Sequence, residues 1–322
     1  MFCVRGQYFG ASKSQRYAEI ISFVPFHKSI QIDGMRSIHR LLLWHYSIAP
    51  DFVLNSGPEP DSDLAVSSLA ADLYRLSNLM KVEAYDSKSG KVNYAQLSTS
   101  STYIEYRKCA CHLQAFDPII LTYRKEQLAF WINLYNALIM DAVIQFDVKD
   151  SVTEVPGFFW RVAYLIGGQR YCAFDIEYGI LRANASHPAI PGAHFGARDP
   201  RRQYSLLHLD PRVHFALVCA ARSCPPISVY HAEQIDPQLD LATEAYINGG
   251  GALIDRSRSE VLFSRIFQWY APDFGGRLFG LGSKYPLLEF IARYLSDISD
   301  REFILHSKVN VRFQPYDWTL NN

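Results

Sequence analysis

The order of apolar and polar residues predicts a chain made mainly of helices, with a few short strands. The strongest predicted helix runs from Thr122 to Gln145, and its run Ala129–Ala137 is apolar on nearly every side, which indicates a helix at the centre of the fold. Elsewhere apolar residues recur every three or four positions, the spacing of a helix that buries one face. The other predicted helices are Gly34–Ala49, Asp63–Met80, Thr99–Phe116, Asp175–Arg182, Pro237–Asn248 and Pro286–Leu295.

Short strands are predicted where β-favouring residues lie between turn residues. Two hairpins and a closing strand fit this pattern: Arg161–Ile166 with Gln169–Phe174, Ala252–Asp255 with Glu260–Phe263, and Val309–Trp318. Val213 to Cys219 is apolar apart from His214, and we expect a buried strand there. Pro225 and Pro226 cannot continue a strand ladder, so the chain should leave the sheet in a loop. Binding and catalytic groups tend to lie in such loops.

A linker divides the chain. The stretch from Asn55 to Asp63 holds Ser56, Gly57, Pro58 and Pro60, which are typical of a loop without regular structure. We therefore expect residues 1–62 to be an N-terminal segment of unknown role with its linker. Residues 63–322 are expected to form a single domain.

Composition narrows the class of protein. The 322 residues carry 32 Lys plus Arg and 32 Asp plus Glu, so the charge gives no argument for binding nucleic acid or an anionic membrane. No apolar run of signal-peptide length follows the N-terminus, and polar residues inside Leu128–Phe146 favour a buried helix over a membrane span. Six cysteines are too few for a disulfide framework in a chain this long. We expect a cytoplasmic protein with reduced thiols.

The candidate chemistry centres on His214, Cys219 and Cys224. Side chains alternate between the faces of a strand, so Cys219, five positions after His214, would face the other way and lie roughly 16 Å along a straight strand. Cys224 follows the strand, in a loop that can fold back over the His214 face. We therefore prefer Cys224 as the reactive thiol and keep Cys219 as the alternative nucleophile. The competing interpretation is that both cysteines are inert core residues, as free cysteines usually are.

Two further observations bear on this site. Asn133 and Asn136 lie three positions apart on one helix face, and buried amides need hydrogen-bond partners. They either brace neighbouring backbone or orient a catalytic loop and donate to an oxyanion, as Arg222 and Ser223 of the loop also can. A zinc site built from His214 and the two cysteines is disfavoured because no second ligand pair of suitable spacing follows. No metal or cofactor is therefore expected.

Six segments stand out together between about residue 65 and the end of the chain. They are Gly90-Lys91-Val92-Asn93-Tyr94, Ala129 to Ala137, Asp175 to Arg182, His214-Phe215-Ala216-Leu217 with Ser223-Cys224-Pro225-Pro226, Trp269 with Asp273-Phe274, and Tyr316-Asp317-Trp318 near Leu320-Asn321. In this order they resemble one family, catalogued as domain of unknown function 547.

The resemblance implies an α+β domain whose helices pack on a mixed or antiparallel sheet, in a papain- or transglutaminase-like arrangement. It also implies a Glu–His–Cys constellation, which here points to Glu177, His214 and a cysteine of the Cys219/Cys224 pair. Some relatives are fused to glutaredoxin domains, which hints at glutathione or protein-thiol chemistry. This chain departs from the family at Val218, where many bacterial relatives carry Asn.

Two functional hypotheses follow. The first is a cysteine-dependent hydrolase or transferase acting on glutathione conjugates or on peptide or isopeptide bonds. In it His214 would lower the pKa of the Cys224 thiol, and Glu177 would accept a hydrogen bond from the other imidazole nitrogen. The second is a catalytically inactive interaction or adaptor module on the same fold. A small thiol or peptide is the expected substrate, a protein partner could bind through residues 1–62, and no nucleic acid or membrane is expected.

Overall fold

The fold is taken from a computed structural model that describes residues 52–57, 66–188, 190–275 and 284–322. Most of the expected N-terminal segment, including the predicted helix Gly34–Ala49, lies outside the described residues. Within them the chain is α+β, with helices and three small sheets.

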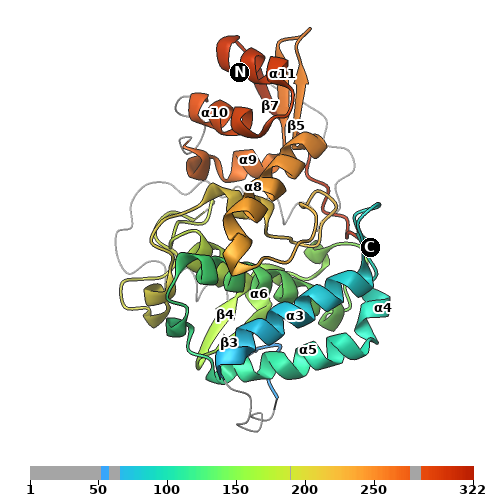
Figure 1. The fold of residues 1–322 in the computed structure, drawn as a ribbon, viewed down its shortest axis with the longest axis vertical. Coiled ribbons are helices and arrows are strands. Elements are labelled where there is room, and N and C mark those ends of the chain that lie inside the picture. Colours follow the sequence, from blue (N-terminus) through green and yellow to red (C-terminus); the bar gives the residue numbers. More distant parts are fainter. Residues whose placement is uncertain (1–51, 58–65, 189, 276–283) are drawn as a thin grey trace, which may run out of the picture.

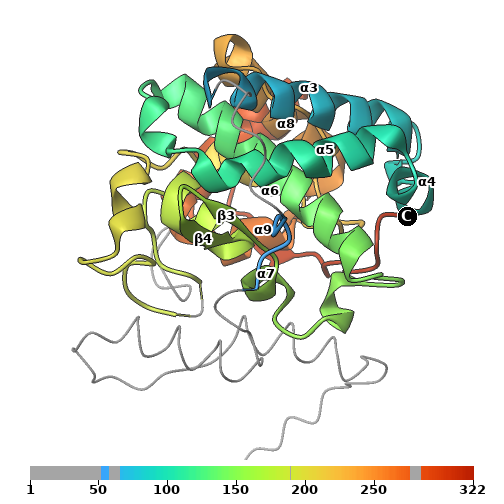
Figure 2. The same cartoon turned by 90° about the horizontal axis from the view of Figure 1, so that it is seen from below.

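Three helices form the lower half of the molecule in Figure 1. They are α3 (Val66–Ala84), α5 (Ser101–Cys111) and α6 (Arg124–Gln145). Figures 1 and 2 show α3 and α5 side by side, and α3 also packs on α6. The short α4 (Tyr94–Ser98) precedes α5 and is joined to α3 by a hairpin of β1 (Tyr85–Asp86) and β2 (Lys91–Val92).

Helix α6 is the centre of this half, as its sequence predicts. Every residue from Leu128 to Val143 is buried. By length and composition this helix could cross a membrane, but 89% of its most apolar segment is buried inside the protein. The all-round apolar surface is therefore covered by neighbouring elements.

A predicted hairpin leads into the site. Strands β3 (Ala163–Ile166) and β4 (Gln169–Cys172) pair antiparallel, with Ala163 opposite Cys172. Gly167 and Gly168 connect them with φ of +54° and +74°, a left-handed conformation that favours glycine. The chain then enters η4 (Asp175–Leu181), a π-helix rather than the α-helix expected here, and all of its residues are buried.

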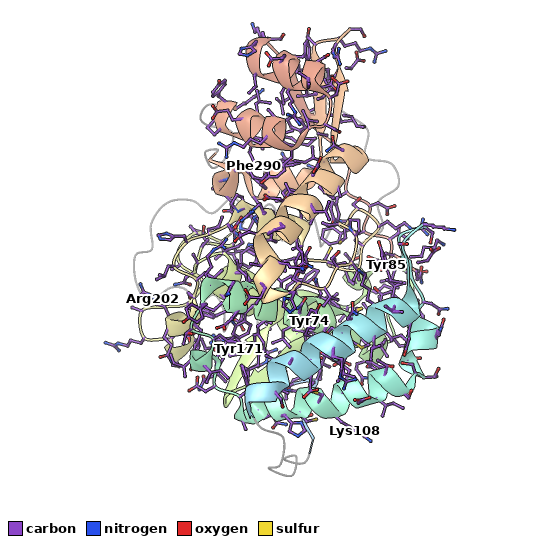
Figure 3. The ribbon with its side chains drawn as sticks, in the orientation of Figure 1. Tyr74, Tyr85, Lys108, Tyr171, Arg202 and Phe290 are labelled. Atoms are coloured by element: carbon purple, nitrogen blue, oxygen red, sulfur yellow. The ribbon has the colours of Figure 1, made fainter. Side chains whose placement is uncertain are left out.

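The upper half of Figure 1 has its own sheet. Its strands are β5 (Ala252–Asp255), β6 (Glu260–Phe263) and β7 (Asn310–Phe313), with β6 antiparallel to β5 and parallel to β7. The helices of this half are α8 (Ile235–Tyr246), α9 (Arg265–Trp269), α10 (Tyr285–Tyr294) and α11 (Ile298–His306). Phe290 of α10 belongs to its core, whereas Tyr171 of β4 belongs to the core of the lower half; both are labelled in Figure 3.

The expectation of helices packed on one mixed or antiparallel sheet needs correction. The described residues form separate sheets of two, two and three strands, and they show no papain- or transglutaminase-like arrangement.

The predicted strand from Val213 to Cys219 is wrong. Asp210 caps η6 (Pro211–Phe215), a 3-10 helix, by accepting a hydrogen bond from the Arg212 amide at 3.1 Å, and proline suits the first helical position. The run is apolar because it passes between two cores. Phe215 packs in the core of the upper half, while its neighbour Ala216 packs in the core of the lower half.

Candidate functional site

The two candidate thiols meet. Cys219 Sγ lies 2.8 Å from Cys224 Sγ, and the Cys219 amide donates a hydrogen bond to Cys224 Sγ at 3.1 Å. Between them Ala220 has a φ of +64°, which residues with a side chain rarely adopt, and the chain turns back on itself. The Cys224 amide closes the turn by donating to the Ala221 carbonyl at 3.0 Å. Our argument that strand geometry separates the two cysteines is therefore wrong.

The hydroxyl of Tyr316 touches both thiols. It lies 3.3 Å from Cys219 Sγ and 3.3 Å from Cys224 Sγ. The ring of Tyr316 packs against Trp269 and Trp318, with ring centroids 4.9 and 4.8 Å away, and the two tryptophan rings also contact each other. These aromatic contacts fix the direction in which the hydroxyl points.

The C-terminal segment that carries Tyr316 is tied to the cysteine loop. Ser223 Oγ accepts a hydrogen bond from the Asp317 amide at 2.8 Å, and the Ser223 amide donates to the Asp317 carbonyl at 3.3 Å. The Arg222 amide donates to the Thr319 carbonyl at 2.8 Å, while the Arg222 side chain is exposed. Ser223 therefore holds the segment with Tyr316 in place, and the Arg222 side chain extends into solvent beside it.

The hydrogen bonds separate the pKa values of the two thiols. Burial would raise the pKa of Cys224, but hydrogen bonds from the Cys219 thiol, the Tyr316 hydroxyl and the amides of Ala221 and Cys219 bring it below the ordinary value. The bond that Cys219 makes to Cys224, together with burial, raises the pKa of Cys219 well above the ordinary value. Cys224 is thus the more acidic of the two thiols.

His214 belongs to a second cluster. Its Nε2 lies 2.7 Å from Asp273 Oδ2, and the Arg182 guanidinium binds both oxygens of the same carboxylate, with Nε 2.6 Å from Oδ2 and Nη2 2.8 Å from Oδ1. The three side chains are 2, 4 and 3% exposed for His214, Asp273 and Arg182. Such a two-point contact between guanidinium and carboxylate is strong and fixes the orientation of both groups.

Burial and the charges of this cluster determine the protonation of Asp273 and His214. Burial would raise the pKa of Asp273, but the hydrogen bonds from His214 and Arg182 lower it to about 2. Burial also lowers the pKa of His214, against the opposing effect of Asp273. In the neutral imidazole, Nε2–H therefore donates a hydrogen bond to the ionised Asp273 carboxylate, and Nδ1 carries the lone pair.

Glu177 does not hold His214, contrary to our expectation. Its Oε1 accepts a hydrogen bond from the Tyr270 hydroxyl at 2.5 Å, and its Oε2 accepts one from Tyr135 at 3.3 Å. Tyr270 in turn stacks on the His214 ring, with centroids 3.9 Å apart. Asp273 has the orienting position that we assigned to Glu177, and Glu177 acts on the histidine only through the tyrosine ring and its charge.

The expected thiol–imidazole pair is not formed. Among the described residues no hydrogen bond joins His214 to Cys219 or Cys224. Tyr135 donates to Glu177, and burial first, and then the charges of Glu177 and Cys219, raise the pKa of its hydroxyl well above the ordinary value. The dithiol and the histidine are therefore two separate hydrogen-bonded clusters rather than a bonded pair.

With this geometry in hand, comparison with known proteins adds one result. Residues 120–247 match the family model described as "Protein of unknown function, DUF547". No curated protein and no solved structure matches the chain. The region matched to DUF547 includes Glu177, His214 and both thiols, whereas Asp273 and Tyr316 lie beyond its end.

Within the DUF547 region the two asparagines of α6 brace backbone. Asn133 Nδ2 donates to the Tyr230 carbonyl at 2.7 Å, and its Oδ1 accepts from the Tyr230 amide at 2.8 Å. Asn136 binds the Ala216 carbonyl and the Val218 amide in the same way, both at 2.9 Å. Their amide groups are therefore occupied, and the bracing alternative describes them better than an oxyanion role.

The zinc alternative also loses its basis. Within the described ranges no group of three or more His, Cys, Asp and Glu side chains converges in a way that could hold a metal ion. His214 and the two cysteines therefore do not form a shared ligand set.

Proposed function

We propose that the protein is a cysteine-dependent hydrolase or transferase whose nucleophile is Cys224. The observation that carries the proposal is the set of donors around Cys224 Sγ: the Cys219 thiol at 2.8 Å, the Cys219 amide at 3.1 Å and the Tyr316 hydroxyl at 3.3 Å. The thiolate is the reactive form of cysteine, and donors aimed at the sulfur stabilise that form. Cys224 can therefore ionise without a histidine bonded to it.

His214 has a separate part in the proposed reaction. Its neutral imidazole, held through Nε2 by Asp273, can accept a proton at Nδ1 from an attacking water or return one to a leaving group. Asp273 stabilises the imidazolium that forms. Proton transfer at the substrate and ionisation of the nucleophile are thus assigned to different groups.

The sequence resemblance implied a cysteine nucleophile, although the described residues show no papain- or transglutaminase-like arrangement. The donor set around Cys224 supports that nucleophile independently of the resemblance. The constellation we propose is Cys224 as nucleophile, Tyr316 as the donor that stabilises its thiolate, and His214 with Asp273 for proton transfer.

The pH dependence of iodoacetamide alkylation, read by peptide mass spectrometry, tests the proposal. We expect Cys224 to react with an apparent pKa below the ordinary value of about 8.5. The same apparent pKa should be found in His214→Ala. A second measurement tests acyl transfer. An aryl thioester should acylate Cys224, which mass spectrometry detects as an adduct. The adduct should then disappear with time, and more slowly in His214→Ala than in wild type. An ordinary pKa together with no adduct on Cys224 would overturn the proposal.

A further inference from the structure

We infer that Cys219 is the resolving thiol of a dithiol–disulfide couple with Cys224, and that the substrates of this site include small disulfides and mixed disulfides. The inference rests on the proposed nucleophile and names a substrate class for it. Four features of the site support it: the approach of the two sulfurs, the asymmetry between them, the outcome of each alternative reaction, and access from solvent.

The two sulfur atoms are positioned to bond. They lie 2.8 Å apart, and a disulfide bond is about 2.05 Å long, so joining them needs less than about 1 Å of movement. The turn at Ala220 already places both side chains on one side of the loop.

The two thiols differ in the manner that a nucleophile and a resolving thiol require. Hydrogen bonds lower the pKa of Cys224, and the bond to Cys224 is the main reason that the pKa of Cys219 is raised. Once Cys224 is in a mixed disulfide it carries no negative charge and no longer accepts from Cys219. The largest cause that raises the pKa of Cys219 is then gone, so the first step prepares the second.

The position of Cys219 distinguishes disulfide substrates from acyl substrates. If Cys224 holds an acyl group, attack by Cys219 only moves that group from one sulfur to the other. If Cys224 holds a mixed disulfide, the same attack completes a reaction. A thiol at 2.8 Å acts at a very high effective concentration, so it reaches the mixed disulfide before any thiol from solution.

Both steps are thiol–disulfide exchanges and balance without another reactant. The Cys224 thiolate attacks one sulfur of R–S–S–R, forms Cys224–S–S–R and releases RS⁻. Cys219 loses its proton to solvent and attacks the Cys224 sulfur, which forms the Cys219–Cys224 disulfide and releases the second RS⁻. The substrate gains two electrons and the protein dithiol loses two. Two external thiols, of the glutathione class, return the protein to its reduced form.

The site is not fully covered by the protein. Cys219, Cys224 and Tyr316 are each half-buried rather than fully covered. The loop presents the exposed Arg222 beside them, which suits a substrate with carboxylates. Cys109 and Cys172, by contrast, are buried, and burial raises the pKa of the Cys109 thiol to about 12.

The test uses the full chain, reduced and freed of reductant, with 5,5′-dithiobis(2-nitrobenzoate) as the disulfide. We expect wild type to release two equivalents of thionitrobenzoate from this site and to keep no adduct there. Formation of the Cys219–Cys224 disulfide should lower the mass of the protein by about 2 Da. Because trypsin cleaves after Arg222, the two cysteines fall on separate peptides, and the oxidised protein should give a disulfide-linked pair. Cys219→Ser should release one equivalent and keep the adduct on Cys224.

The controls separate this inference from the proposed function. Cys224→Ser removes the hydrogen bond that raises the pKa of Cys219, so it should release at most one equivalent from the site and give no disulfide-linked peptides. The double variant Cys219→Ser with Cys224→Ser gives the background from other cysteines. Cys111→Ser, a half-buried cysteine outside the site, should behave as wild type. If Cys224 keeps a lowered alkylation pKa but wild type retains the adduct and forms no linked peptides, the inference fails while the proposed nucleophile stands. If Cys224 is unreactive to both reagents, both fail.

Discussion

Nε2 of His214 lies 2.7 Å from Oδ2 of Asp273, a residue 59 positions further along the chain. Arg182, from the end of η4, binds the same carboxylate from the other side. Three segments therefore meet through one buried carboxylate. Because a buried charge is costly unless it is paired, each member of this cluster depends on the other two.

Replacing Arg182 with Met should destabilise the protein by about 3–5 kcal/mol, since it leaves the Asp273 carboxylate buried without its cation. Urea unfolding at neutral pH measures the change. The pKa of His214, followed by NMR of labelled histidine, should rise because the nearby positive charge lowers it in wild type.

Two variants sharpen this prediction. Arg256 pairs with Asp297 and Asp300 on the surface, so Arg256→Met should change stability much less than Arg182→Met does. The double variant Arg182→Met with Asp273→Asn removes both charges and should lose less stability than the two single changes added together. Simple additivity of the two losses would contradict the interpretation of a coupled buried pair.

Tyr316→Phe should raise the alkylation pKa of Cys224. The change removes one hydrogen bond to the thiolate, worth about 1.5–3 kcal/mol for a charged group. One pKa unit corresponds to about 1.36 kcal/mol, so a rise of about one to two units is expected. The ring and its packing against Trp269 and Trp318 are kept, so the fold should be unaffected.

The matched control is Tyr204→Phe. It removes a hydroxyl that donates to Asp117 and that makes no hydrogen bond to either thiol among the described residues. Its Cys224 should titrate as in wild type. An unchanged pKa in Tyr316→Phe would show that the tyrosine packs beside the thiols without stabilising the charge.

Asn136→Ala should cost about 2–4 kcal/mol of stability, because the Ala216 carbonyl and the Val218 amide would both lose their buried partner. Thermal or urea unfolding provides the measurement. Asn310→Ala, at an exposed position of β7, should cost about 0.5 kcal/mol or less. Equal losses in the two variants would mean that Asn136 does not brace the segment after His214.

Local pattern was sufficient for part of the fold. It predicts α6, the hairpin of β3 and β4, and the pair β5 and β6, because each has a clear period or turn. It does not predict α11 (Ile298–His306), although Asp297 caps that helix by accepting from the amides of Ser299 and Asp300. The nearly continuous apolar run at Val213 also misleads, since burial from two sides looks the same in a 3-10 helix and in a strand.

The contacts of the site residues with distant parts of the chain could not be predicted from local sequence pattern. Sequence identified His214, Cys219 and Cys224 from their chemistry, and geometry along an ideal strand then separated the two thiols wrongly. Asp273 and Tyr316 were visible only as parts of motifs, since nothing in local pattern shows which distant residue a buried histidine or thiol will meet. A polar aromatic run such as Tyr316-Asp317-Trp318 was the one signal available for the tyrosine.

His187 should make the stability of the protein depend on pH. Its side chain is buried against the rings of Phe174 and Tyr178, and burial, with the nearby charges of His194 and Arg182, lowers its pKa to about 3. The unfolded chain has an ordinary histidine pKa of about 6.5. Below that pH the unfolded state therefore binds one more proton than the folded state, and stability falls as the pH drops from about 6.5 toward 3.

Urea unfolding of wild type and His187→Gln at several pH values between 4 and 7 tests this dependence. The difference in unfolding free energy between the two proteins should shift in favour of the variant by up to about 1.4 kcal/mol for each pH unit below 6.5. Carboxylates titrate in both proteins, so the comparison cancels their contribution. If the unfolding free energy of His187→Gln runs parallel to that of wild type, His187 takes up its proton within the folded protein and does not drive acid unfolding.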